Sequence, residues 1–487
     1  MYAILNTSNA TIIGIRTMMD LDLVDYKEEI GIVLERASKA AKVLETFNQV
    51  QVDQIVRELA KAVHDNAVVL AEEAVLETRM GNVNDKIIKN RTKSELIYND
   101  LLKEKTVGII DDSPENGMIE IAEPVGIVAA IVPCTNPSVT AMSNAMFCIK
   151  TRNPIIIAPH PRAQKVTVHT VKLMTEAARK VGLPSGAIQV LVGADKEAIQ
   201  ELMHNSNYIL ATGGAGMVKA AYSSGKPSLG VGAGNVPAVI HSSANIEKSV
   251  SDIIASKTFD NGLICASEQA VIVSRDISAQ VWDEFKKQGG FVTSIPEKLM
   301  LQHAVFDENG HVLPNVIGQS AKTIANLAGL TLPETPEIKL FVVPSEGVGP
   351  EYPFSSEKMS PILAFFITPN FDKSIEFAQK ILSYQGAGHT ASIHTNDKES
   401  ALKFAMSVKA SRVLVNQPAA TSSGGARHNK LTPTTTLGCG SWGGNITSDN
   451  ITAHHLINKK RVAFRLKTPL DTTGIFENEP LQAEVVS

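Results

Sequence analysis

Four short apolar runs, separated by helical stretches, constrain the fold of this chain more than any other feature of its sequence. The runs read GIVAAIVP, NPIIIAP, AIQVLV and YILAT, and all of them lie between residues 126 and 212. Runs that are apolar throughout are typical of strands covered on both faces, and their alternation with helices predicts a parallel sheet. We therefore predict an α/β fold that binds its ligands at the carboxyl ends of these strands.

A second set of apolar runs follows the glycine-rich stretch GVGAGNVP. It comprises PAVIH, AVIVS, LFVVP, ILAFFIT, ASIHT and RVLVNQP. With 487 residues the chain exceeds what one hydrophobic core normally supports, so we predict two domains. The first spans 1–236 together with 430–465 and contains N-terminal helices over 25–78 and a hairpin over 106–124. The second spans 237–429, and 466–487 form a surface tail.

The composition of the chain argues against several classes of partner and site. Lys and Arg number 46 and Asp and Glu 50, a balance of −4 that argues against a nucleic-acid partner. No run approaches the ~18 apolar residues needed to span a bilayer, and the first residues lack the pattern of a secretory signal, so we expect a cytoplasmic protein. The four cysteines have neither CxxC spacing nor histidines at metal-binding distance, which predicts no disulfide framework and no metal site.

The stretch DNGLICASEQ raises the question of whether Cys265 is chemically reactive. The thiol follows a turn signal, and free backbone N–H groups at a turn would favour the thiolate and stabilise an oxyanion. A lone cysteine is also commonly a small buried core residue. The spacing alone leaves both interpretations open.

Two further stretches have the residue types of a ligand site. TGGAG follows the strand YILAT and begins a helix, which suits a nucleotide phosphate but also an ordinary strand-to-helix turn. PCTNP follows the first buried strand, where two prolines would fix the loop around Asn136. An Asn side chain there can donate to a developing oxyanion or can serve only as a turn residue.

Longer stretches resemble the aldehyde dehydrogenase superfamily over about residues 25–465. They are AEPVGIVAAIVPCTNP, KTRNPIIIAPHPRA, ILATGGAGMVKAAYSSGKPSLGVGAGN, KTFDNGLICASEQAVIV, EKMSPIL, GAGHTASIHT and TTTLGCGSWGGN. The similarity is strongest to the CoA-acylating branch, which includes acetaldehyde, propionaldehyde and succinate semialdehyde dehydrogenases and the aldehyde half of bifunctional aldehyde-alcohol dehydrogenases. It implies a Rossmann-type cofactor-binding domain, a second α/β catalytic domain and an oligomerisation hairpin.

The resemblance also implies roles for individual residues. Cys265 matches the nucleophile that forms a thiohemiacetal and then a thioester, and Asn136 matches the amide that stabilises the oxyanion. The segment of Thr212, Gly213 and Gly214 matches the turn that approaches the nicotinamide cofactor. Glu357 matches the acid that binds the nicotinamide ribose, although a solvated surface Glu is the alternative.

Departures from the hydrolytic members of the superfamily indicate the acyl acceptor. Those enzymes have a general-base Glu in a Glu-Leu-Gly-Gly motif, whereas the equivalent stretch here is Val231-Gly232-Ala233-Gly234-Asn235. A thioester without a base to activate water should persist until a thiol, coenzyme A, releases it. The expected reaction converts an aldehyde, CoA and NAD(P)⁺ into an acyl-CoA and NAD(P)H. A hydrolytic enzyme and an inactive nucleotide-binding relative remain the alternatives.

The choice of cofactor and aldehyde is less defined. The stretch Ala158-Pro159-His160-Pro161 stands where many hydrolytic relatives have a Lys and, three residues on, a Glu for the adenosine ribose. His160 and Arg162 can meet the adenosine end of NAD or NADP or a CoA phosphate, with NAD favoured. Arg427 and His428, in a loop that varies in this branch, are predicted to hold the anionic end of a semialdehyde or to be a solvated pair.

Three further expectations come from the resemblance. His389 resembles a residue near the active site but can equally be structural. The implied assembly is a homodimer or homotetramer built through 106–124 and 450–465. Residues 1–20 suit either a short helix, as in microcompartment enzymes, or a disordered end.

Overall fold

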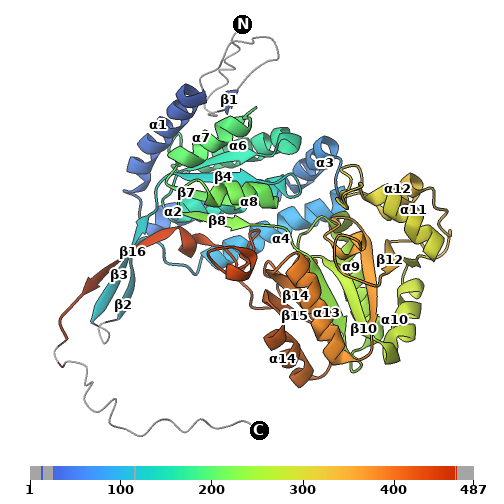
Figure 1. Ribbon diagram of the computed structural model, residues 1–487. Helices are drawn as coiled ribbons and strands as arrows, with labels where there is room; N and C mark the ends of the chain where they lie inside the picture. Colours follow the sequence, from blue (N-terminus) through green and yellow to red (C-terminus); the bar gives the residue numbers. More distant parts are fainter. Residues whose placement is uncertain (1–11, 15–25, 114–116, 467, 469–487) are drawn as a thin grey trace.

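The computed structural model describes residues 12–14, 26–113, 117–466 and 468, and builds them around two parallel sheets and one small antiparallel sheet (Figure 1). The first sheet has six strands in the order β1-β6-β5-β4-β7-β8. Their bounds in that order are Ile12–Gly14, Ile188–Val192, Ile155–Pro159, Val128–Val132, Tyr208–Thr212 and Ser228–Val231.

Helices cover both faces of the first sheet. Along β4, Val128, Ala130 and Val132 face the core formed with α2, α4, α5 and α6, while Ala129 and Ile131 face α1, α7 and α8. Alternate residues of a strand point to opposite faces, so a strand between two helical layers must be apolar throughout. The helices of this half are α1 Tyr26–Leu44, α2 Gln49–Asp65, α3 Ala67–Thr78, α4 Val83–Leu101, α5 Pro137–Lys150, α6 Gln164–Arg179, α7 Lys196–Asn205 and α8 Ala215–Tyr222.

The second sheet has seven parallel strands in the order β11-β12-β13-β10-β9-β14-β15. Their bounds in that order are Gly290–Val292, Leu340–Pro344, Ile362–Thr368, Glu268–Ser274, Val236–Ile240, Gly388–His394 and Ala410–Val415. Helices α9 and α10 cover one face, and α11 to α14 cover the other. The helices here are α9 Ile246–Thr258, α10 Arg275–Lys287, α11 Ile295–Val305, α12 Ala321–Ala328, α13 Phe371–Tyr384, α14 Lys398–Ser407 and α15 Ala419–Ser422.

The predicted hairpin is present and acquires a third strand. β2 (Gly108–Ser113) pairs antiparallel with β3 (Met118–Pro124), and β3 pairs on its other side with β16 (Ile457–Ala463). Figure 1 shows this three-stranded sheet projecting away from the rest of the molecule. It leaves β2 and β16 as edge strands.

Two details differ from the expectations drawn from the sequence. Ile12–Gly14 form strand β1 beside β6, although we predicted a helix or a disordered end over 1–20; the other residues of that segment, and nearly all of the predicted tail, lie outside the described residues. Glu268 and Gln269 begin β10 instead of extending the loop after Cys265. Among the described residues, no helix is both long enough and apolar enough to cross a membrane.

Candidate active site

Two sheet edges meet where the chain passes from the first sheet to the second. β8 ends at Val231 and β9 begins at Val236, so the carboxyl ends of the first set of strands lie toward the amino ends of the second. In the first sheet β5, β4 and β7 are neighbours; His160 directly follows β5, the loop that contains Asn136 follows β4, and Thr212 is the last residue of β7. This edge gathers the residues predicted to meet the cofactor and the oxyanion.

The opposite edge gathers the residues predicted to act on the substrate. Strands β13, β10, β9 and β14 are neighbours, and Glu357, Cys265, Gly234 and His389 lie at or just before their amino ends. The prediction of ligand binding at carboxyl ends was made for the first set of strands. In the second sheet the predicted site residues lie at the amino ends instead, because the predicted nucleophile Cys265 precedes its strand.

Gly234 brings three of these residues together. Its N–H donates to Glu357 Oε1 over 3.3 Å. A Cβ at this position would overlap the carbonyl oxygen of Cys265 and would lie 3.3 Å from Cγ of His389. The backbone of Gly234 packs against the carbonyl of Cys265, so only glycine fits at this position.

The environment of Cys265 corrects one prediction. The side chain is partly buried, and the packing around the thiol raises its pKa to about 12, with the charges of Glu357 and Cys439 adding to the effect. Arg412 and a backbone hydrogen bond act in the opposite direction but more weakly. The prediction that turn N–H groups would favour the thiolate is therefore wrong for this arrangement, because desolvation outweighs them. Cys265 is therefore a neutral thiol at pH 7, and the predicted attack on an aldehyde would require the loss of its proton.

Glu357 offers a test of this electrostatic environment. Burial raises the pKa of Glu357 to about 7, so its charge appears only above that pH and then disfavours a thiolate at Cys265. We expect Glu357→Gln to lower the pKa of Cys265 and to speed its alkylation by iodoacetamide several-fold above pH 7. Below pH 6 the two proteins should react alike, because Glu357 is then neutral in both. Peptide mass spectrometry measures alkylation at Cys265 separately from that at the other cysteines; equal rates at pH 9 would contradict the coupling.

His389 is buried and electrically neutral. Burial, reinforced by Arg412, lowers its pKa to about 3. Its Nδ1 lies 3.0 Å from Thr390 Oγ1, while Nε2 has no hydrogen-bond partner among the residues that the structure describes. A pKa this low makes the imidazole a weak base that would not readily take a proton from a thiol, so the catalytic and the structural interpretation of His389 both stay predictions.

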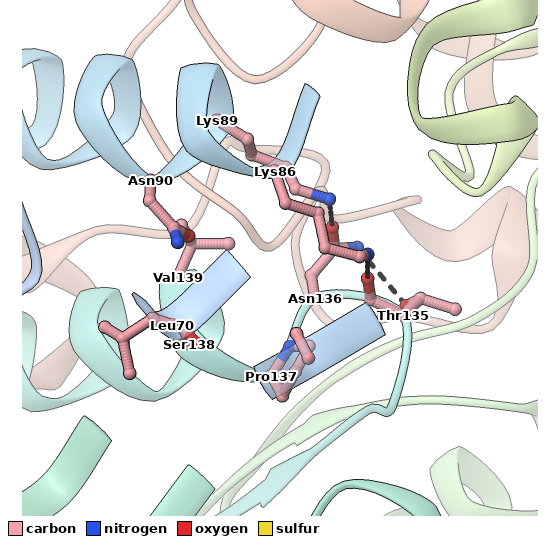
Figure 2. A pocket seen from close by; sticks show the side chains of 10 residues that line it. Leu70, Lys86, Lys89, Asn90, Thr135, Asn136, Pro137, Ser138 and Val139 are labelled. Atoms are coloured by element: carbon pink, nitrogen blue, oxygen red, sulfur yellow. Dashed lines mark hydrogen bonds between the residues drawn. The ribbon is translucent and has the colours of Figure 1, made fainter. Parts of the chain in front are cut away.

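Asn136 lies in a loop held by lysines of α4 (Figure 2). Its Oδ1 accepts a hydrogen bond of 2.5 Å from Lys89 Nζ, and its Nδ2 donates to Thr135 Oγ1 over 3.2 Å. Lys89 and Lys86 both pair with Asp260, at 2.5 and 2.9 Å. We did not single out these three residues from the sequence, since lysines on a helix normally face water. The spacing of Lys86 and Lys89 on one helical face was the only available signal.

The cofactor edge has the features that a dinucleotide requires. Gly214 precedes α8, and no side chain caps its N-terminal N–H groups. A Cβ on Gly214 would meet nothing within 4 Å, so a phosphate has room beside those N–H groups. Thr212 Oγ1 lies 3.3 Å from Thr436 Oγ1. The residues present therefore fit a pyrophosphate at Thr212, Gly213 and Gly214.

His160 and Arg162 lie at the end of the neighbouring strand β5 and are exposed. Arg162 N–H donates to His160 Nδ1 over 3.1 Å, and the Arg162 guanidinium donates to the carbonyl of Thr78. Burial and the charge of Arg162 lower the pKa of His160. Both side chains stand at the edge where the adenosine end of the cofactor is expected.

Arg427 and His428 have partners within the protein. Arg427 forms an ion pair with Glu95 of α4 and keeps 73% of its side chain exposed. His428 Nε2 lies 3.0 Å from Ser422 Oγ. An anion-binding role for this pair stays a prediction, and the ion pair with Glu95 is the arrangement that a bound carboxylate would have to replace.

One group of potential metal ligands occurs among the described residues, formed by Asp449, His454 and His455. The N–H of Thr452 donates to Nδ1 of His455, which therefore has its proton on Nε2 and donates it to Asp449. A metal would need that nitrogen unprotonated. Hydrogen bonding accounts for this group without an ion.

Comparisons with known proteins point to one family. The model of the aldehyde dehydrogenase family matches residues 22–293. The chain is 43% identical over 432 residues to the acetylating succinate-semialdehyde dehydrogenase of Clostridium kluyveri, covering 89% of this chain and 95% of the relative. It spans about half the length of the curated aldehyde-alcohol dehydrogenases that it matches, 52% and 50% in two cases.

Comparison with solved structures also finds aldehyde dehydrogenases. An acetylating aldehyde dehydrogenase from Geobacillus thermoglucosidasius superimposes with a TM-score of 0.89 at 44% identity, covering 93% of this chain and all of that one. A propionaldehyde dehydrogenase from Rhodopseudomonas palustris, solved with bound CoA and an acylated cysteine, superimposes with a TM-score of 0.79 at 27% identity and covers 89% of this chain and 97% of that one.

Proposed function

Because the chain belongs to the aldehyde dehydrogenase family, we propose that it is a CoA-acylating aldehyde dehydrogenase with Cys265 as its nucleophile. It would oxidise a short aldehyde with NAD⁺ or NADP⁺ and transfer the acyl group to coenzyme A. The relatives named above act on succinate semialdehyde and propionaldehyde, and the substrate proposed here is an aldehyde of this size, with or without a distal carboxylate.

The observation that carries the proposal is the backbone stretch that packs against Cys265. Gly234 presents only its peptide group to Cys265, and the stretch from Val231 to Asn235 contains no carboxylate. The nearby acid, Glu357, accepts the Gly234 N–H with Oε1. The carboxylate that hydrolytic members have in this stretch is therefore missing beside Cys265, which favours transfer of the thioester to a thiol.

Cys265, Asn136 and the turn from Thr212 to Gly214 have roles in the proposed reaction. The Cys265 sulfur bonds to the aldehyde carbon while its proton passes to water, and Asn136 Nδ2 stabilises the oxyanion that the carbonyl oxygen becomes. A nicotinamide cofactor held at Thr212 to Gly214 would supply the hydride acceptor for oxidation of this adduct to a thioester. The CoA sulfur then bonds to the acyl carbon as the bond to Cys265 breaks, and the proton of the CoA thiol passes to the departing Cys265 sulfur.

The decisive experiment is mass-spectrometric detection of the acyl product across acetaldehyde, propionaldehyde and succinate semialdehyde, with each nicotinamide cofactor. We expect acyl-CoA as product, and without CoA we expect NAD(P)H formation to fall to about one turnover per site. The free acid as main product, formed at the same rate without CoA, would establish hydrolytic function instead. No product under any condition would favour an inactive relative.

We also propose that the protein assembles through its small antiparallel sheet. The edge strands β2 and β16 expose backbone groups that can pair with a second copy, and Ile109, Val462 and Phe464 place apolar side chains on this sheet and its extension. A homodimer, or a homotetramer built from dimers, would cover them.

A further inference from the structure

We propose that Lys89 is a positioning residue that fixes which face of the Asn136 amide is presented to the reacting aldehyde. The inference rests on the proposed function, in which Asn136 stabilises the oxyanion. Lys89 itself acts only through that side chain.

The chemistry of the lysine ammonium sets the orientation of the amide. An ammonium has three donors and no acceptor, so the amide atom facing it must be the oxygen. Lys89 Nζ lies 2.5 Å from Oδ1 of Asn136, which directs the NH₂ group away from Lys89, at the other edge of the planar amide (Figure 2). Nδ2 carries two hydrogens, and one of them goes to Thr135 Oγ1 at 3.2 Å. The second hydrogen remains for an oxyanion.

A buried ion cluster holds Lys89 in place. Lys86 and Lys89 are 3% and 8% exposed, and Asp260, which contacts both, is fully buried. The other carboxylate oxygen of Asp260 accepts the N–H of Asn82 over 3.1 Å. Since the interior screens charges poorly, this cluster costs more free energy to rearrange than a surface ion pair.

The cluster also ties Asn136 to the loop of the nucleophile. Asp260 and Asn261 have left-handed backbones, with φ of 50° and 54°, in the turn that leads to Cys265. Asp85 of α4 accepts the N–H of Asp260 over 2.7 Å, so α4 holds this turn through backbone as well as side chain. Lys89 thus contacts the oxyanion loop and the turn before the nucleophile with one ammonium.

Two consequences distinguish positioning from general stabilisation. First, the ammonium polarises the amide, which makes Nδ2 a stronger donor when negative charge develops. Second, its loss should slow the chemical step without weakening binding, because the ground-state aldehyde carries no full negative charge. Lys86 contacts the same Asp260 but meets only the carbonyl of Thr135, at 3.4 Å, and so provides a matched comparison.

The test compares Lys89→Met with Lys86→Met, each in the wild-type and in the Asn136→Ala background. Either single variant leaves Asp260 with one lysine, so we expect similar losses of thermal stability. We expect only Lys89→Met to lower kcat for acyl-CoA formation, by about 10- to 100-fold with KM for aldehyde unchanged. In the Asn136→Ala background we expect Lys89→Met to lower kcat by less than about a further twofold, because the amide that Lys89 orients is absent.

Further outcomes decide against the proposal. Losses that multiply when Lys89→Met and Asn136→Ala are combined, or equal kcat losses for Lys86→Met and Lys89→Met, would show a merely structural role. Lys89→Gln keeps an N–H donor without the charge, so it should recover part of kcat. If Lys89→Met fails to fold, Lys89→Gln replaces it in the combination with Asn136→Ala. If the wild-type enzyme itself makes no acyl-CoA, the proposed function fails, and that result is separate from the behaviour of Lys89.

Discussion

Cys265→Ala is expected to lower kcat by at least about 10⁴-fold, because no other group can form the covalent adduct. The wild-type protein, incubated with aldehyde and oxidised cofactor in the absence of CoA, should gain the mass of one acyl group at Cys265. The variant should gain none. Intact-protein and peptide mass spectrometry measure both results.

Cys439→Ala is the matched control for this substitution. Cys439 is buried, and its thiol raises the pKa of Cys265 through its charge, but it has no proposed part in the reaction. We expect this variant to keep the acyl mass at Cys265. Turnover retained in Cys265→Ala, or acylation moved to Cys439, would rule out the proposed nucleophile.

Asn136→Ala is expected to lower kcat by about 10²- to 10³-fold, the loss typical for one oxyanion donor. KM for CoA should stay within about threefold, because the amide acts on the aldehyde oxygen and not on the thiol acceptor. Stopped-flow measurement of NADH formation in a single turnover isolates the step that should slow.

Asn136→Asp tests the hydrogen bond donated by Asn136 Nδ2 separately from the packing of the side chain. This variant keeps the shape of the side chain but replaces Nδ2 by a charged oxygen that cannot donate. It should be at least as slow as Asn136→Ala although Lys89 gains an ion pair. Near wild-type rates in Asn136→Asp would place oxyanion stabilisation elsewhere.

The sequence was a good guide to strands and a poor one to buried charge. Val128 to Val132 had to be a covered strand because all five residues are apolar, and the structure confirms this. The order of strands was not predictable, since it depends on which helix packs on which face. Ile12 to Gly14 illustrate this, because a strand this short is stabilised by pairing with β6 and has little pattern of its own.

The candidate site likewise contains residues that the sequence indicated and residues that it did not. Cys265, Asn136 and Glu357 stood out through motifs and a family resemblance, while their roles remain predictions. Lys89 and Asp260 did not stand out, because their contact joins segments far apart in the chain and a helical lysine is usually exposed. The acidity of the thiol was also out of reach, since it depends on how tightly the surrounding residues exclude water.

The meeting of two sheet edges has a consequence for how such an enzyme can be altered. Most of the residues proposed to hold the dinucleotide lie after β5 and β7, with Glu357 before β13 as the exception, whereas Cys265 lies in the loop before β10 and His389 in β14. Substitution of His160 or Arg162 should therefore change the preference between NAD and NADP while leaving acyl transfer intact. Replacement of loops of the second sheet should change the acyl-transfer half of the reaction and leave coenzyme preference intact. Specificity for the coenzyme and specificity for the aldehyde can then change independently of each other, so the same fold can act on new aldehydes without a change of coenzyme.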